Sequence, residues 1–366
     1  MSKLLLRYPW VSAPLIVGAP MRVFSGPALA VSISRAGGLG FIGPAAKTED
    51  TITDLEQALS LVRDVRSSSS LDAFSRIQES SSATSTSVLP IGVGFQLWKD
   101  DLNVVVTAME KYRPCAAWLF APRQVKEFDD WSSRIRNASP QTQIWIQIGS
   151  VGEARSLLSN SEKPDVLVIQ GSEAGGHGRE KDGIGLITLF PEVADILASG
   201  NRNIPLVAAG GIVDGRGVTA ALSLGASGAA MGTRFLASTE ARIQKGYQDE
   251  IVRASDGAVS TVRTLLYNHL RGIYGWPEGY SPRTIVNQSY TEYLAGRPFE
   301  ELKRLHDEEN ARSGGGGGWG PEGRLGTYAG ASVGLIREVK PAVDIVHEVR
   351  EDVLRRIRAL QSQTSE

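Results

Sequence analysis

One histidine of the sequence stands in a glycine-rich segment, residues 170–178, which reads Gln-Gly-Ser-Glu-Ala-Gly-Gly-His-Gly. Because imidazole titrates near neutral pH and can take up or release a proton, His177 is a candidate general base. A lone histidine is more often a surface or structural residue, but the flanking glycines allow close approach of a ligand and add nothing to core packing. We therefore predict a reactive role for His177, and interpret His269, His306 and His347, which lie in polar or helical contexts, as structural or exposed.

Two glycine turns later in the chain are suited to a phosphate group. They read Ala208-Ala209-Gly210-Gly211-Ile212 and Ala230-Met231-Gly232-Thr233-Arg234. Without a Cβ, glycine lets backbone N–H groups reach phosphate oxygens, and Thr233 and Arg234 could add side-chain donors. Either turn alone would be an ordinary strand-to-helix connection, but two such turns at the ends of neighbouring strands favour a phosphate site that includes a helix N-terminus. A phosphate site alone does not distinguish a cofactor that carries a phosphate from a phosphorylated substrate.

Small residues also follow an apolar run near the start of the chain, where the sequence reads Gly18-Ala19-Pro20-Met21. Small side chains leave space for a flat ligand against the backbone, so Ala19, Pro20 and Met21 are expected to line the floor of a pocket. For Gly37 and Gly38, which precede the next apolar run, a tight turn and a helix cap are sufficient explanations.

Eight short apolar runs supply the strands that would position these residues. They occupy residues 14–19, 39–42, 89–95, 116–120, 144–148, 166–169, 204–209 and 229–232. Runs that are apolar throughout are typical of parallel strands buried on both faces. Segments between them have helical spacing, as in Leu102, Val105, Val106, Met109 and Tyr112, and in Val218, Ala221, Leu222 and Gly225. Eight such units predict an α/β fold, a closed (β/α)8 TIM barrel whose catalytic face lies at the carboxyl ends of the strands.

The remaining segments suggest how the chain is divided. We expect residues 1–239 to form the barrel core with the ligand site, residues 240–325 a mainly helical insertion after the eighth strand that could cover the site, and residues 326–366 a segment that packs back on the barrel. That last segment ends in an amphipathic helix with one apolar stripe, Val346, Val349, Val353, Ile357 and Leu360. The serine-rich residues 67–87 are predicted to be a mobile surface insertion, and the glycine run 314–318 a flexible loop.

Composition narrows the class of protein. Hydrophobic residues at 42% and charged residues at 22% are typical of a globular protein, and the net charge of -1 favours neither nucleic acid nor a membrane surface as a partner. The single cysteine, Cys115, cannot form an intrachain disulfide and is interpreted as a buried strand residue. No histidine spacing resembles a metal-ligand set. Without a signal-like N-terminus, a peroxisomal C-terminus or an apolar stretch of ~18 residues, a cytoplasmic location is expected.

Taken together, these motifs resemble the nitronate monooxygenase family, formerly called 2-nitropropane dioxygenases, and in particular its fungal-type members. Five motifs occur in the family's order: Gly-Ala-Pro-Met, Ala-Gly-Gly-Leu-Gly-Phe-Ile-Gly, Gln-Gly-Ser-Glu-Ala-Gly-Gly-His-Gly, Ala-Ala-Gly-Gly-Ile and Met-Gly-Thr-Arg-Phe. Later segments around Leu270-Arg271-Gly272, Trp276-Pro277 and Tyr328-Ala329-Gly330 also resemble the family. The match covers nearly the whole chain.

The resemblance implies an FMN-dependent monooxygenase that oxidises nitronates or nitroalkanes with O2 to a carbonyl compound and nitrite, without a nicotinamide cofactor. Ala19, Pro20 and Met21 would contact the isoalloxazine, and Gln170 and Gly175 would lie near the flavin and its ribityl chain. The phosphate would be held by Gly211, Ala230, Met231, Gly232 and Thr233. His177 would accept the α-proton of a neutral nitroalkane.

Two departures from the family pattern affect the substrate. Gln96 follows the third apolar run where many members have asparagine, and the bulky Arg22-Val23-Phe24 follows Met21 where small residues are frequent, which would narrow the pocket. The physiological substrate is therefore not defined by the sequence.

Other functions stay open. A flavin-dependent enoyl reductase would use NAD(P)H, and an FMN-binding protein could serve a biosynthetic pathway without this turnover. An inosine-monophosphate-dehydrogenase-like barrel would need a loop cysteine, whereas Cys115 lies in a predicted strand. A non-redox isomerase or aldolase could use the phosphate turns, but Lys99 and Lys181 lie in predicted loops rather than at strand ends, which argues against a Schiff base.

Overall fold

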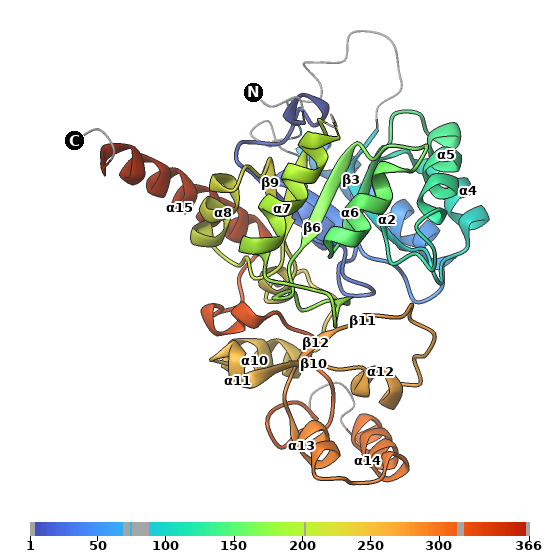
Figure 1. Ribbon diagram of the computed structural model, residues 1–366, viewed down its shortest axis with the longest axis vertical. Helices are drawn as coiled ribbons and strands as arrows, with labels where there is room; N and C mark the ends of the chain where they lie inside the picture. Colours follow the sequence, from blue (N-terminus) through green and yellow to red (C-terminus); the bar gives the residue numbers. More distant parts are fainter. Residues whose placement is uncertain (1–3, 69–73, 75–87, 201–202, 313–317, 364–366) are drawn as a thin grey trace.

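A closed barrel of eight parallel strands forms the centre of the computed structural model, which describes residues 4–68, 74, 88–200, 203–312 and 318–363 (Figure 1). The barrel strands are β1 (Leu15–Gly18), β2 (Leu39–Ile42), β3 (Leu89–Gln96), β4 (Pro114–Phe120), β5 (Gln143–Ile148), β6 (Val166–Gln170), β8 (Leu206–Ala209) and β9 (Gly228–Met231). They are hydrogen-bonded in this order, and β9 closes the barrel by pairing with β1 from Leu15↔Gly228 to Gly18↔Met231. Each apolar run of the sequence corresponds to one strand, so the predicted TIM barrel is confirmed.

Aromatic side chains fill the inside of the barrel. Phe41, Trp118 and Trp145 come from β2, β4 and β5 and are buried, with ring centroids 5.1–5.7 Å apart. Gly92 of β3 makes room for them, since a Cβ there would lie 2.2 Å from the Phe41 ring. Cys115, in β4, is buried as predicted. The packed interior supports a pocket above it, at the carboxyl ends of the strands.

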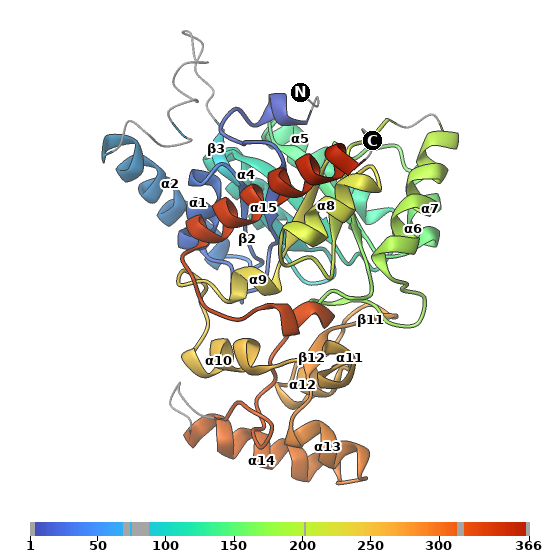
Figure 2. The ribbon, with the colours of Figure 1, turned by 90° about the vertical axis from the view of Figure 1, so that its left-hand side faces the viewer.

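Helices cover the outside of the barrel. They are α1 (Pro27–Arg35), α2 (Asp50–Ser68), α4 (Leu102–Tyr112), α5 (Glu127–Ala138), α6 (Val151–Leu158), α7 (Leu186–Ser199), α8 (Gly215–Ser223), the short α9 (Thr233–Leu236) and, before β1, η1 (Leu5–Arg7). The final helix, α15 (Ala342–Gln363), packs against α8 and α1 (Figure 2). Val346, Val349 and Val353 are buried there.

Two details of the predicted helix faces were wrong. Leu360 of the α15 stripe is 49% exposed, because the last turns of α15 extend beyond the barrel (Figure 1). Gly225 is not on a packed face of α8: it follows the end of the helix with φ 96°, the left-handed conformation that glycine adopts most easily.

The chain after β9 forms a second layer of structure over one end of the barrel (Figures 1 and 2). Its elements are α10 (Lys245–Arg253), α11 (Gly257–Ser260), β10 (Thr261–Arg263), α12 (Leu266–Leu270), β11 (Tyr280–Ser281), β12 (Arg283–Ile285), α13 (Gln288–Leu294), α14 (Phe299–Arg312) and η2 (Ala331–Leu335). β10 pairs with β12, and β11 pairs with β7 (Gly178–Arg179) directly after His177. We propose that most of this layer corresponds to the insertion of residues 240–325, which follows a barrel core of residues 1–239. η2 belongs to the returning segment of residues 326–366 and joins the layer by packing against α10 and α11.

Most of the serine-rich segment and of the glycine run lies outside the described residues, so both predictions stay as they were made. Within the described residues, no group of three or more His, Cys, Asp and Glu side chains could hold a metal ion. None of the helices seen there is long and apolar enough to cross a membrane.

Candidate active site

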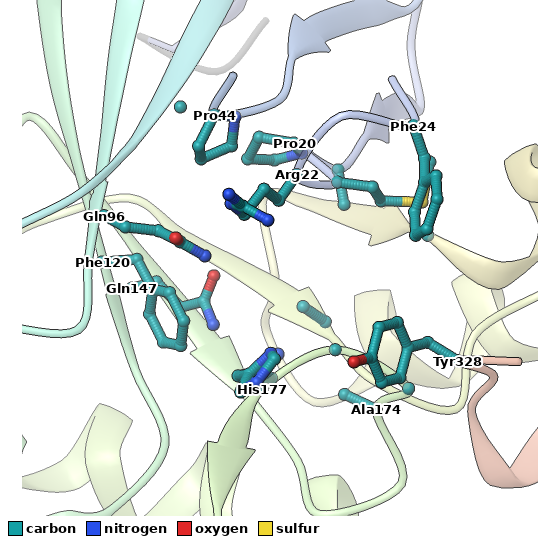
Figure 3. Close-up of a pocket in the computed structure, with 18 of the residues that line it drawn as sticks. Pro20, Arg22, Phe24, Pro44, Gln96, Phe120, Gln147, Ala174, His177 and Tyr328 are labelled. Carbon is teal, nitrogen blue, oxygen red and sulfur yellow. The ribbon is translucent and has the colours of Figure 1, made fainter. Parts of the chain in front are cut away.

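A cavity of about 420 Å³ lies between the carboxyl ends of the barrel strands and the layer that follows β9 (Figure 3). This volume is in the range that small-molecule sites occupy. Ten residues predicted from the sequence line it: Ala19, Pro20, Met21, Gln170, Gly175, His177, Gly211, Ala230, Gly232 and Thr233. They come from the segment after β1, from the end of β6 and the loop that follows it, and from the turns after β8 and at the end of β9. The barrel thus brings together motifs that are far apart in the sequence.

Two residues singled out from the sequence do not line this cavity. Met231 is completely buried in β9, between Ala230 and Gly232, which do line it. Its backbone oxygen accepts a hydrogen bond from Ala19 N at 3.0 Å, so it supports the floor from behind. The Arg234 guanidinium donates to the backbone oxygen of Glu338 at 3.0 Å and is not available to a phosphate in the cavity.

His177 lies at one side of the cavity against an aromatic wall. Its ring stacks on Trp276, with centroids 3.5 Å apart and planes 6° apart. Trp276 is held in turn by Trp98, at 5.1 Å between ring centroids. Burial lowers the pKa of His177 well below its ordinary value of 6.5, and the positive charges of Arg271 and Arg263 lower it further. The imidazole is therefore neutral at neutral pH, which is the form that accepts a proton.

Glutamine side chains from β3 and β5 point into the cavity (Figure 3), and Gln170 of β6 also lines it. Gln147 accepts a hydrogen bond at Oε1 from Trp118 Nε1 at 2.9 Å. The backbone of Gln96 is fixed by the Asp100 carboxylate, which accepts from Gln96 N at 2.7 Å. Its own Oε1 is buried and has no hydrogen-bond partner within the described residues. This orphaned acceptor is suited to an N–H group of a ligand.

The glycine turns after β8 and β9 meet the chain that returns before α15. Gly211 has φ 72°, a conformation that favours glycine. Thr233 Oγ1 accepts from Gly330 N at 3.0 Å, which leaves its own proton free to be donated. Ser332, not predicted from the sequence, donates to Gly211 O and lines the cavity. The N-terminus of α8 is capped by the Asp214 carboxylate, which accepts from the backbone N–H groups of Arg216 and Gly217.

Comparison with known proteins identifies the family. The family described as nitronate monooxygenase matches residues 131–275. The nitronate monooxygenase npaC of Metarhizium robertsii is 58% identical to this chain over 344 residues, which cover 94% of the chain and 92% of that protein. This chain belongs to the nitronate monooxygenase family. A nitronate monooxygenase of Neurospora crassa is 31% identical, with 99% of this chain and 95% of that protein covered.

A solved structure agrees with this assignment. FabK from Thermotoga maritima superposes with a TM-score of 0.70 at 25% identity, over 99% of each chain. The protein is thus an enzyme, a flavin-dependent oxidoreductase of the nitronate monooxygenase family.

Three positively charged side chains line the cavity of this nitronate monooxygenase family member: Arg22, Lys99 and Arg271. Arg22 and Lys99 both donate to the backbone oxygen of Ala46, at 3.4 and 3.0 Å. Burial lowers the pKa of Lys99, and the nearby Arg22 lowers it further. None of the three takes part in an ion pair within the described residues, so together they favour an anionic ligand. Lys99 lies in a loop, as predicted, but that loop adjoins the site.

Several cavity residues had no role assigned from the sequence: Arg22, Lys99, Asn268, Arg271, Trp276, Tyr328 and Ser332. Arg271, Trp276 and Tyr328 stand in segments that resemble the nitronate monooxygenase family, and this was the available signal. Arg22 had been recognised only as a bulky residue. Nothing in the spacing of Asn268 or Ser332 distinguishes them from other polar residues of the same segments.

The loop that carries His177 is held by a half-buried arginine of β10. Arg263 Nη2 donates to Ser172 O at 3.1 Å and to Ala174 O at 3.0 Å, and Nη1 donates to the backbone oxygens of Gly176 and Ser281. Burial lowers the pKa of Arg263 to about 10, so it remains charged at neutral pH. One guanidinium thus satisfies four carbonyl groups, as its five donors allow.

Arg263→Ala is expected to destabilise the protein strongly, because each buried carbonyl left without a donor costs about 1–3 kcal/mol. Arg263→Lys, which keeps the charge but has fewer donors, should lie between the alanine variant and wild type. Thermal unfolding measures both, with Arg304→Ala, which breaks a surface ion pair with Glu308, as the control with little effect. Equal melting temperatures for Arg263→Ala and wild type would contradict this role.

Proposed function

We propose that the cavity binds FMN and that the enzyme oxidises nitronates with O2, releasing a carbonyl compound and nitrite. Neutral nitroalkanes are substrates after His177 has removed their α-proton. One observation carries the proposal: His177, the orphaned oxygen of Gln96 and both glycine turns all face a single cavity. Membership of the nitronate monooxygenase family supports the same reaction.

The cavity suits the ring system of FMN. The buried Gln96 Oε1 would accept the N–H of the isoalloxazine's pyrimidine part, recovering the roughly 1–3 kcal/mol that an unpaired buried acceptor costs. Gln147 and Gln170 also line the cavity, and their amide groups can donate to ring oxygens and nitrogens. Ala19, Pro20 and Met21 would support the ring from below with small or flexible side chains, as the sequence suggested.

The other end of the cavity suits a phosphate. Gly211 and Gly232 present backbone without a side chain in between, and Thr233 has a hydroxyl proton to donate. Because Asp214 already caps α8, the donors would come from the two turns rather than from that helix. Ala230 adjoins this end, and Gly175 would lie beside the ribityl chain, where its backbone packs against Ala329 and Gly330.

In the proposed reaction, bound FMN supplies the transfer of electrons from the nitronate to O2. The neutral imidazole of His177 accepts the α-proton of a nitroalkane, and the electron pair of the broken C–H bond stays on the substrate as the nitronate forms. Arg22, Lys99 and Arg271 favour this anion over the neutral nitroalkane by Coulomb attraction. Trp276 shields the imidazole on one face. A nitronate supplied ready-made needs no base.

The activity with neutral nitroalkanes should persist at unusually low pH. Its general base must be deprotonated, so kcat/KM falls as the pH drops through the pKa of His177, which lies well below 6.5 because of burial and of Arg271, Arg263 and Arg22. We expect kcat/KM to stay level through pH 6.5 and to decline only below it. Arg22→Met removes one positive charge and should move the decline to higher pH. A wild-type decline at or above pH 6.5 would contradict this account.

The cofactor is tested by titrating flavin-free protein with FMN, FAD and riboflavin while following flavin fluorescence. Tightest binding of FMN is expected, with riboflavin weaker because it has no phosphate for the glycine turns. Equal affinity for riboflavin would contradict the phosphate site. Adding NADH to the FMN-loaded protein in the absence of oxygen distinguishes the proposed function from that of an enoyl reductase. Bleaching of the flavin by NADH would favour the reductase.

A further inference from the structure

A continuous chain of hydrogen bonds runs from Arg271 to the imidazole of His177. Arg271 Nη2 donates to the hydroxyl oxygen of Tyr328, whose hydroxyl lies 2.7 Å from Asn268 Oδ1. Asn268 Nδ2 lies 2.7 Å from His177 Nε2. Figure 3 shows the hydroxyl of Tyr328 pointing toward the side on which His177 lies. The chain connects a cation at the cavity with the nitrogen of the proposed base.

Asn268 and the backbone of Tyr328 are held by the protein around them. Asn268 lies in α12 and is completely buried. The backbone of Tyr328 is held at both its N–H and its C=O by the hydroxyl of Tyr247, at 2.7 and 3.1 Å. The Arg271 guanidinium lies over the Tyr328 ring, 4.8 Å from its centroid. Asn268 and Tyr328 are therefore held by the surrounding protein, whereas the Arg271 side chain is exposed and is held by its contacts with Tyr328.

The direction of the hydrogen bonds follows from the chemistry of the groups. Arginine only donates, so the Tyr328 oxygen accepts from Arg271 and its own proton is directed to Asn268 Oδ1. The asparagine amide then has its NH2 group toward His177. Because that group carries hydrogens, Nε2 of His177 must accept and cannot carry a proton. The reversed amide would place two donors on the Tyr328 oxygen and take away the acceptor of its proton.

We propose that Arg271, Tyr328 and Asn268 act as positioning residues that hold His177 in the tautomer with its proton on Nδ1, so that Nε2 is the atom that accepts the substrate proton. A proton on Nε2 would face the N–H of Asn268. Without bound substrate, the imidazole of His177 is therefore favoured in its neutral form. For proton transfer the Asn268 N–H must give up its hydrogen bond to Nε2. The α-proton of the bound nitroalkane then moves to Nε2, and the C–H electron pair becomes part of the nitronate C=N bond. The catalytic consequence rests on the proposed function, whereas the tautomer does not.

The tautomer can be read directly by long-range ¹H–¹⁵N NMR of purified full-length protein labelled in its four histidines. The spectrum of His177→Gln identifies the His177 signals by their loss. We expect the Nδ1–H pattern in wild type. In Asn268→Asp a carboxylate replaces the amide and accepts from Nε2–H, so the pattern should change to the Nε2–H tautomer or to imidazolium. An Nε2–H pattern in wild type would overturn the proposal.

Kinetics provide the second readout. Asn268→Asp moves the basic lone pair away from Nε2, so kcat/KM for a neutral nitroalkane should fall by roughly 10²-fold, at the lower end of what a general base contributes. The rate with a pre-formed nitronate should change less than about twofold, since that substrate bypasses the base. Asn103→Asp, on the exposed face of α4, introduces the same charge away from the cavity as a control.

Tyr328→Phe tests the chain if Asn268→Asp does not fold. Losing the phenol proton removes the orientation of the Asn268 amide, so both histidine tautomers should be present. The positioning role would be overturned if these variants lost equal activity with nitroalkane and with nitronate while the NMR pattern of His177 stayed as in wild type. If wild type turns over no nitronate, the proposed function fails, and the NMR result still decides the tautomer.

Discussion

His177→Gln is expected to lower kcat/KM for a neutral nitroalkane by roughly 10²–10⁴-fold, the contribution of a positioned general base. The same variant should keep its rate with the corresponding pre-formed nitronate, because that anion has already lost the α-proton. The two substrates differ only in this proton. The ratio of the two rates, compared between variant and wild type, therefore isolates the role of the base. Oxygen uptake with each substrate measures the effect.

His347→Gln is the matched control, because His347 lies on the exposed face of α15, away from the cavity. It should behave as wild type with both substrates. An equal loss with nitroalkane and nitronate in His177→Gln would mean that the imidazole contributes to substrate or flavin binding instead of proton abstraction. No loss with either substrate would remove His177 from the reaction.

Gly232→Leu is expected to block FMN binding while leaving the fold intact. A Cβ at Gly232 would meet Met21 Sδ at 3.5 Å and Ala19 Cβ at 3.8 Å, both ordinary contacts, so the backbone accepts a side chain. The rest of the leucine would occupy space in the proposed cofactor site. Such overpacking costs about 1–3 kcal/mol or more, which corresponds to roughly a 10- to 100-fold weaker Kd for FMN.

The graded variant Gly232→Ala adds only the tolerated Cβ and should weaken FMN binding much less. Gly152→Leu introduces the same side chain on the exposed face of α6, with no atom closer than 3.8 Å to its Cβ, and should bind FMN as wild type does. Circular dichroism checks that all three variants fold. A folded Gly232→Leu protein with undiminished FMN affinity would show that the cofactor does not occupy this end of the cavity.

The barrel could be predicted because its strands are continuous apolar runs, which only a sheet covered on both faces can bury. Ala19, Gln170, Gly211 and Gly232 could be predicted as neighbours for a related reason. They stand at the ends of parallel strands, and such ends converge on one face of the barrel. The alternation of side chains along a strand would also have separated Met231 from Ala230 and Gly232, since neighbouring residues point to opposite sides.

The other wall of the cavity could not be derived from spacing. Asn268, Trp276 and Tyr328 lie 91 to 151 residues after His177, and their approach depends on how the layer after β9 docks. That docking rests on long-range contacts such as the pairing of β11 with β7 and the bonds from Arg263 to the loop before His177. Two-residue strands and a single half-buried arginine leave no periodic signal in a sequence.

The proposed reaction is tested most directly by following oxygen consumption and nitrite release together after a pre-formed nitronate is added to FMN-loaded enzyme without NADH. Oxygen should be consumed at once, and nitrite and a carbonyl compound should appear with it. A loaded, folded enzyme that consumes no oxygen with any nitronate until NADH is supplied would contradict the proposed reaction.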